Sequence, residues 1–274
     1  RRARRPGSPP KALSSRSRLS RIDQRAPSRY IPAAFMSITS IRPIVAARAL
    51  RNVFAEPDET KHVFEVIDAL QGPTLGRVRA RLRRSEQGRR LLETKPDLLP
   101  LLNDREGLRA LPDGSLGRAY LAFVESENIT AQGLVEASDL AREDRRHAEL
   151  VWIKDWLRDT HDLWHAVLGY KGDLIGEAAL LAFSHYETGN PGVGAIAALA
   201  WLKLGRETDP RIRARHTVRD GRRIAKRAAW FLEIPWHEWL ARPLDEVRRD
   251  LRVAGPVDYQ PVRSHEVDMS LVPG

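Results

Sequence analysis

The sequence predicts an all-α protein with one helical domain. Apolar residues recur at three- and four-residue spacing through most of the chain after residue 36, as in helices that bury one face. No stretch alternates apolar and polar residues between turn signals, as a half-buried strand would. With 274 residues, 42% of them hydrophobic, the chain can bury a core of its own. We place the domain at residues 36–259, between a basic tail (1–35) and a C-terminal tail (260–274).

The first helices of the domain are expected where apolar spacing and capping signals coincide, at residues 43–55, 58–70, 75–92, 98–104 and 115–124. In the second helix, Val63 and Ile67 are i and i+4, and Gly72 followed by proline ends it. Two glycines weaken the third helix, and the fourth is short. Ser115 follows the turn sequence Leu-Pro-Asp-Gly, so it can cap the fifth.

The later helices follow the same apolar spacing, at residues 144–168, 175–187, 192–204, 209–231 and 244–251. Gly169 and Gly172 lie between the first two of these. Glycine is the residue that most readily ends a helix, so the chain can reverse here into an antiparallel helix.

Composition excludes several classes of protein. The chain has no cysteine, which excludes a disulfide scaffold, thiolate zinc fingers, iron–sulfur ligation and thiol catalysis. It has no run of about 18 apolar residues, so a helix that spans a membrane is excluded as well.

The net charge of +10 belongs to the basic tail rather than to the domain. Residues 1–35 carry nine Arg and Lys11 against one acid, Asp23, a net charge of +9. Subtraction from 46 basic and 36 acidic residues leaves 36 and 35, a net charge of +1 from Met36 onward. A nucleic-acid-binding domain carries its positive charge on its own surface, so we expect no nucleic-acid partner.

The basic tail is rich in Arg, Ser and Pro and lacks apolar periodicity, so we expect it to be disordered. Its acid-poor composition is typical of a mitochondrial transit peptide. Alternatively, Met36 is the true start, and the residues before it result from a misplaced start. The 39 Arg against seven Lys suggest a GC-rich genome and favour this bacterial alternative.

One segment, from Arg158 to Glu177, carries residues suited to metal chemistry. His161 and His165 are i and i+4, so both imidazoles project from one face of a helix, with Asp162 beside them. After the chain reverses, Glu177 lies in the first turns of the returning helix. Two antiparallel helices can thus bring two imidazoles and two carboxylates together, a set of ligands that suits Zn²⁺.

The same residues have simpler interpretations. A histidine on an amphipathic helix is commonly a packed or solvated residue, and Asp162 could pair with Arg158 at i−4. The motif is also similar to the His-Glu-x-x-His helix of zinc hydrolases, in which the acid is the general base. Because Asp is one methylene shorter than Glu, Asp162 is either a direct ligand or a group that supports the ligands.

The motif His161-Asp-x-x-His165, followed by eleven residues and Glu177, resembles that of the Coq-four family of ubiquinone-biosynthesis proteins. Its helical segment Leu-Pro-x-Gly-Thr-Leu-Gly-x-x-Tyr-x-x-Phe is similar to residues 111–123, with Ser115 in place of Thr.

The end of the chain agrees with the same family. Its closing pattern Trp-x-x-x-Leu…Leu-Asn-Val-x-x-Pro is similar to the segment from Trp239 to Tyr259, with Arg252 in place of Asn. The resemblance covers roughly residues 41–259. Residues 141–150 are more charged than the family pattern, as in a divergent bacterial branch.

The resemblance implies a helical protein that binds zinc through His161, Asp162, His165 and Glu177. It also implies removal of the ring carboxylate from a polyprenylated hydroxybenzoate precursor of ubiquinone. The implied partners are this substrate, other ubiquinone-biosynthesis proteins, a membrane surface and a second copy in a homodimer. We expect a cytoplasmic protein, peripheral on the inner membrane, if the chain is bacterial, and one on the matrix side of the mitochondrial inner membrane if it is eukaryotic.

Within such a site, Asp162 is a candidate catalytic residue. Arg158 could support Asp162 or hold the substrate carboxylate, and Tyr170 could donate a proton or simply pack in the core. A catalytic metal must keep a coordination position open, so the protein ligands should not saturate it.

Two further segments could contact lipid. The apolar residues of 192–204 could hold a prenyl chain, although core packing explains them equally. Residues 211–227 hold eight basic side chains, and Trp230, Trp236 and Trp239 follow. This pattern suits an anionic bilayer, and it also suits a solvated helix followed by core aromatics.

Three functions therefore remain open at the level of the sequence. The first is a metal-dependent lyase of quinone biosynthesis. The second is a non-catalytic prenyl-lipid-binding scaffold with a structural metal, and the third is a zinc hydrolase.

Overall fold

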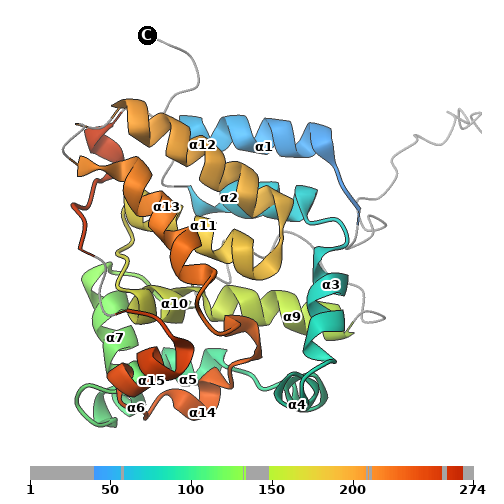
Figure 1. Cartoon of the computed structure of the whole chain (residues 1–274), viewed down its shortest axis with the longest axis vertical. Helices are drawn as coiled ribbons and strands as arrows, with labels where there is room; N and C mark the ends of the chain where they lie inside the picture. The colour runs from blue at the N-terminus through green and yellow to red at the C-terminus, as the bar shows by residue number, and fades with distance from the viewer. Residues whose placement is uncertain are drawn as a thin grey trace, which may run out of the picture. The chain divides into compact units, whose positions relative to one another are not determined.

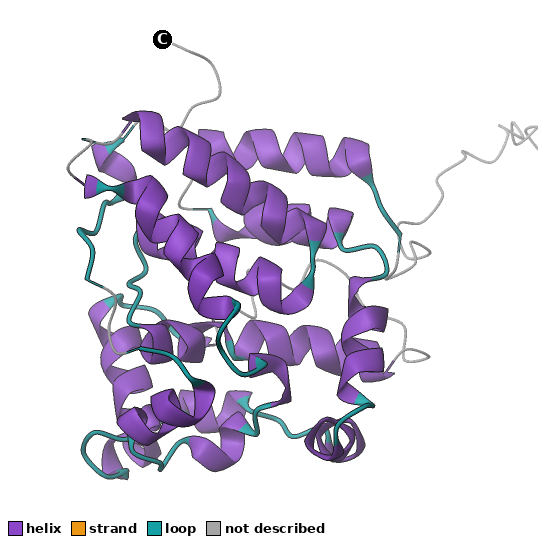
Figure 2. Ribbon diagram, viewed as in Figure 1, coloured by secondary structure: helices purple, strands orange, loops and turns teal. Residues whose placement is uncertain are grey.

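The computed structural model describes residues 40–56, 59–131, 133, 148–207, 209, 212–254 and 258–267. The predictions for the basic tail lie outside these residues. In the described part of the chain the regular elements are helices (Figures 1 and 2), which confirms the predicted all-α fold. They are α1 (Pro43–Ala55), α2 (Thr60–Leu70), α3 (Thr74–Leu82), α4 (Glu86–Thr94), α5 (Leu99–Asn103), α6 (Arg105–Ala110), α7 (Leu116–Ser126), α9 (Ala148–Asp159), α10 (His161–Leu168), α11 (Leu174–Thr188), α12 (Pro191–Glu207), α13 (Ala214–Ala225), η4 (Phe231–Glu233), α14 (Trp236–Trp239), α15 (Leu244–Leu251) and η5 (Ser264–Glu266).

Several boundaries agree closely with the sequence. Helix α1 begins and ends at the predicted residues. The Ser115 hydroxyl accepts a hydrogen bond from the backbone N–H of Arg118, which confirms its role as the cap of α7. Helix α13 is shorter than the predicted 209–231, and the short helices α6 and α14 were not predicted.

Two predicted helices are each divided in two. Within 75–92, Ser85 accepts a hydrogen bond from the N–H of Gly88 and so starts α4 as a new helix. Within 144–168, Thr160 separates α9 from α10. Its hydroxyl donates to the carbonyl of Trp156 at 2.7 Å, and the same carbonyl also accepts the Thr160 N–H at 3.0 Å, an arrangement that can bend a helix.

Helix α10 runs through the interior of the domain. It lies end to end with α9 (Figure 1) and packs against α7 and α15. Every residue from Asp162 to Leu168 is buried, so α10 has no solvated face. The guanidinium of Arg248 on α15 donates to the carbonyls of Ala166 and Val167 and satisfies the C-terminal end of α10. Asp162 and His165 are therefore held inside the core, where polar groups need partners.

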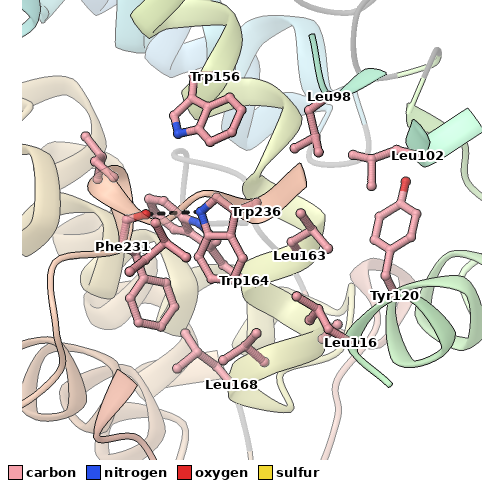
Figure 3. Packing of buried hydrophobic residues seen from close by; sticks show 14 of the residues in the cluster. Leu98, Leu102, Leu116, Tyr120, Trp156, Leu163, Trp164, Leu168, Phe231 and Trp236 are labelled. Atoms are coloured by element: carbon pink, nitrogen blue, oxygen red, sulfur yellow. Dashed lines mark hydrogen bonds between the residues drawn. The ribbon is translucent and has the colours of Figure 1, made fainter. Parts of the chain in front are cut away.

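Aromatic rings join α10 to the segment between α13 and α14 (Figure 3). Trp164 meets Phe231 edge to face, with ring centroids 5.7 Å apart. The indole N–H of Trp236 donates to the carbonyl of Phe231 at 3.0 Å. Trp230 and Trp236 are both buried, so these two tryptophans belong to the core and not to a bilayer interface. No helix of the described residues is both long and apolar enough to cross a membrane.

Helix α11 packs against α12 and α13 and carries Glu177 in its first turn. At Gly221 of α13, a Cβ atom would lie 2.1 Å from the carbonyl oxygen of Ala179 on α11. Only glycine permits this approach of the two backbones, so Gly221 fixes how closely α13 supports α11.

The other end of α11 is tied to the aromatic core by Glu187. This carboxyl group is buried and accepts a hydrogen bond from the N–H of Phe231 at 2.8 Å. The indole N–H of Trp230 donates to the backbone carbonyl of Glu187 at 3.0 Å. Burial raises the pKa of Glu187 to about 8, although the hydrogen bond from Phe231 and the charge of Arg81 oppose the shift.

We predict that Glu187 makes the folded domain less stable as the pH rises from about 4.5 to about 8. In this range the unfolded chain has lost the proton that the folded state still holds, so stability falls by up to about 1.4 kcal/mol per pH unit. The Glu187→Gln variant should lose this dependence. Denaturant unfolding at several pH values measures it, with exposed Glu93→Gln as the matched control. A wild type and a Glu187→Gln variant with parallel stability profiles would contradict the prediction.

Candidate metal centre

The candidate site is built on the hairpin formed by α10 and α11. Gly169 ends α10 with φ +81°, a left-handed conformation that glycine adopts without strain. The carboxylate of Asp173 then accepts hydrogen bonds from the N–H groups of Ile175 and Gly176 and so caps α11. The chain reverses as predicted, and Glu177 comes back alongside the two histidines.

His161, His165 and Glu177 form a group that could hold a metal ion. Glu177 Oε1 lies 3.2 Å from His165 Nε2, and Glu177 Oε2 lies 3.5 Å from His161 Nε2. One ligand atom from each residue lies within 4.8 Å of the others. The two imidazole rings stand nearly perpendicular, with centroids 4.9 Å apart.

The surroundings of His165 favour the tautomer that binds a metal through Nε2. Its Nδ1 lies 3.1 Å from the carbonyl oxygen of Tyr170, which can only accept, so Nδ1 carries the proton, and in the neutral ring Nε2 is the electron-pair donor. The ring is fully buried and stacks on Phe123, with centroids 4.8 Å apart. Although Glu177 Oε1 lies 3.2 Å away, Nε2 makes no hydrogen bond with any described residue. A buried nitrogen of this kind, oriented by its other ring nitrogen, fits a metal ligand.

The close approach of Glu177 and the histidines changes the pKa values of His161 and Glu177. Partial burial would lower the pKa of His161, but the hydrogen bond and negative charge of Glu177 outweigh burial and raise that pKa. Burial would raise the pKa of Glu177, but the neighbouring imidazoles of His165 and His161 together hold it well below its usual range. Glu177 is therefore an ionised carboxylate, the form that binds a cation.

The other predicted site residues, Asp162, Arg158 and Tyr170, are not part of the three-residue group. Asp162 is buried beside the histidines, and burial raises its pKa, but its carboxylate is not a member of the three-residue group. Arg158 pairs with Asp159 at 2.7 Å and with Asp155 at 2.8 Å, which lie on its own helix. Tyr170 contributes its backbone carbonyl, whereas its hydroxyl is buried and has no hydrogen-bond partner in the described structure.

A cavity of about 1060 Å³ adjoins the metal group. Its lining includes charged side chains of α9, α10 and α11, with Lys154, Arg158, His161, Asp162 and Glu177. It also includes apolar side chains of α2, α11 and α12, with Val63, Phe64, Ile67, Leu181, Val193, Ile196, Ala200 and Leu204. A molecule that carries both a polar group and an apolar part could therefore find partners for both in the cavity.

Sequence reasoning missed two supports of the site. Phe123 belongs to the motif of residues 111–123, but nothing in that motif indicated that its ring stacks on His165. The carbonyl of Tyr170 gives no sequence signal, because any residue after the helix end carries one. Lys154 could have been found, since it is one turn before Arg158 and shares its helical face.

Comparisons with known proteins point to one family. A family model described as "Coenzyme Q (ubiquinone) biosynthesis protein Coq4" matches residues 36–256. The mitochondrial ubiquinone biosynthesis protein COQ4 homolog of Danio rerio is 31% identical over 183 residues, 67% of this chain and 65% of that protein. The mitochondrial COQ4 protein of Candida tropicalis is 25% identical over 214 residues, 77% of this chain and 64% of that protein. The chain thus spans slightly less than two thirds of the length of both relatives.

The fold also has a relative of known structure. The crystal structure of a candidate ubiquinone biosynthesis protein from Nostoc punctiforme superposes with a TM-score of 0.59 and 18% sequence identity. The match covers 77% of this chain and 98% of that one, so the same arrangement of helices occurs there.

We predict that the chain binds about one Zn²⁺ per molecule. His165→Ala and Glu177→Ala should each lower zinc affinity by more than about a hundredfold, because even outer partners of ligands contribute about 10- to 100-fold. Competition with a chromophoric chelator measures this affinity. The exposed His216→Ala variant is the control for a lost imidazole. Equal affinities in wild type and His165→Ala would contradict the assignment.

Proposed function

The chain belongs to the Coq4 family of coenzyme Q biosynthesis proteins, and we propose that it removes the ring carboxylate from a polyprenylated hydroxybenzoate. The observation that carries this proposal is a three-residue metal group, His161, His165 and Glu177, beside an amphipathic cavity. The lyase activity, the substrate and the zinc ion are all part of the proposal.

The number of ligands supports a catalytic rather than a structural ion. Structural zinc sites are closed by four protein ligands, whereas catalytic sites offer three and keep a position for water or substrate. Here three of the described residues form the group, and two of them, His161 and Glu177, also line the cavity. A substrate in the cavity would thus reach the remaining position. In this proposal Asp162 supports the group and does not close it as a fourth ligand.

The reaction would break the bond between the ring carbon and its carboxylate, release CO₂ and place one proton on the ring carbon. When bound, a divalent ion would polarise the carboxylate or a phenolic oxygen as a Lewis acid. Arg158 lines the cavity, but Asp155 and Asp159 already balance its guanidinium charge, so in this proposal the bound ion holds the substrate carboxylate and Arg158 supports the wall. Asp162 is our candidate for the proton donor, because burial favours its protonated form.

The apolar part of the cavity is our proposed site for the polyprenyl chain. Val193, Ile196 and Leu204 of α12, which were candidates from the sequence, line it together with side chains of α2. A prenyl chain that enters here leaves water and buries its apolar surface against these residues, which contributes about 25 cal/mol per Å².

A second candidate function is a prenyl-lipid-binding scaffold within the quinone-biosynthesis machinery. It draws support from α13, whose exposed side chains include Arg219, Arg222 and Arg223, and from the exposed Lys226 that follows it. Such a basic face could attach the protein, as a homodimer, to the inner membrane, from the cytoplasm of a bacterium or from the mitochondrial matrix. The relatives from Danio rerio and Candida tropicalis carry the word mitochondrial in their names.

Release of labelled CO₂ tests the lyase directly. We expect the zinc-loaded chain to release ¹³CO₂ from a 4-hydroxy-3-methoxy-5-polyprenylbenzoate labelled at its carboxyl carbon. His161→Ala should lower the rate by at least about a hundredfold, because the ion contributes several kcal/mol. His216→Ala should not. A folded His161→Ala variant that releases CO₂ at the wild-type rate would contradict the metal-dependent step. A zinc-loaded wild type that releases no ¹³CO₂, with a His161→Ala variant that merely unfolds or leaves its complex, would favour the scaffold over the lyase.

We also predict that Ala200→Phe narrows the apolar part of the cavity. It should raise the KM for a substrate with a long prenyl chain by about tenfold or more, since each methylene kept in water costs about 0.8 kcal/mol. Turnover of a substrate with a single prenyl unit should change little. The exposed Ala47→Phe on α1 is the matched control. An equal effect on both substrates would argue against a prenyl chain at α12.

A further inference from the structure

Residues 259–263, here called the C-terminal clasp, cross the loop between α10 and α11. The backbone of Val262 pairs with this loop, because Leu174 N–H donates to the Val262 carbonyl at 2.9 Å. Arg263 donates to the carbonyl of Gly172 at 3.1 Å and pairs with Glu127 at 2.9 Å. The clasp thus joins the hairpin loop to the end of α7, beside the cavity.

Asp173 is the point where the clasp meets the cap of α11. Its buried carboxylate accepts the two capping N–H groups of α11 and also the N–H of Val262 at 3.0 Å, all on Oδ1. The other oxygen, Oδ2, accepts the hydroxyl proton of Tyr259. Four donors around one buried carboxylate leave it little freedom to turn.

Tyr259 holds both ends of this loop at once. Its hydroxyl donates to Asp173 and accepts the backbone N–H of Lys171 at 2.9 Å. A Cβ atom at Gly176 would lie 2.5 Å from the same hydroxyl oxygen, so Tyr259 packs directly on the first turn of α11. Glu177 is the next residue of that turn.

We propose that Tyr259 is a positioning residue for the metal centre, which holds the first turn of α11 so that Glu177 meets His161 and His165. The proposal rests on the metal centre that the proposed function assigns. Glu177 needs such a support because its side chain is 41% exposed, whereas His165 is locked by the core. Without the clasp, the carboxylate would reach the ion from a more mobile turn, and binding would cost more entropy.

Tyr259→Phe tests this inference, because it removes only the hydroxyl. Zinc affinity is measured by chelator competition at a temperature where wild type and variant are both folded. The visible absorption of bound Co²⁺ provides a second readout, since it depends on coordination geometry. The exposed Tyr186→Phe on α11 is the matched control for a lost hydroxyl.

We expect Tyr259→Phe to lower zinc affinity by about tenfold, in the range of outer supports of metal ligands, and to alter the Co²⁺ spectrum. Tyr186→Phe should change neither. A Tyr259→Phe variant that unfolds at lower denaturant yet keeps wild-type zinc affinity and Co²⁺ spectrum would overturn the proposal and leave Tyr259 a purely structural residue.

Two further results distinguish a failure of this inference from a failure of the metal centre itself. If Tyr259→Phe does not fold, Arg263→Gln loosens the same clasp at Gly172 and should lower zinc affinity in the same direction, and an unchanged affinity would overturn the proposal. If wild type itself binds no zinc, the metal centre is wrong, and the role of Tyr259 in it is wrong for that reason.

Discussion

The candidate metal group depends on one polar side chain, the imidazole of His165, which is buried in the apolar core. A helix that is buried on every side normally carries only apolar residues, since a polar group without a partner costs free energy there. Here Nδ1 is satisfied by the Tyr170 carbonyl, and Nε2 is aimed at Glu177. The reversal at Gly169, the cap at Asp173 and the packing of α11 on α13 all serve to bring that carboxylate to the ring.

The metal group and the cavity together impose a type of ligand. A polar site on a flat surface would accept many anions, and an apolar cavity alone would accept many lipids. Because His161 and Glu177 line the same cavity as Val193 and Ile196, a single molecule bound there could contact both charged and apolar side chains. Amphipathic aromatic precursors of quinones have this character, and the membership of the chain in the Coq4 family agrees with it.

Much of the fold and of the candidate site could be predicted from patterns between residues close in the sequence. The i and i+4 histidines, the glycine at the helix end and the Ser115 cap depend on neighbours in the sequence, and the structure agrees with them. Contacts between distant residues were not predictable. The sequence left Arg158 to support Asp162 or to hold a substrate carboxylate, but in the structure it pairs with Asp155 and Asp159 on its own helix. The Phe123 stack and the clasp join residues that no sequence period relates.

The clasp has a consequence for how the protein is made. Val262 follows Asp173 by 89 positions, so the hydrogen bond between them cannot form until the ribosome has added all the residues that lie between. The two histidines and Glu177, by contrast, are close in the chain and can meet before the clasp exists. If Tyr259 positions Glu177 as we propose, a nascent chain would bind a cation only loosely until residues 259–263 had been added.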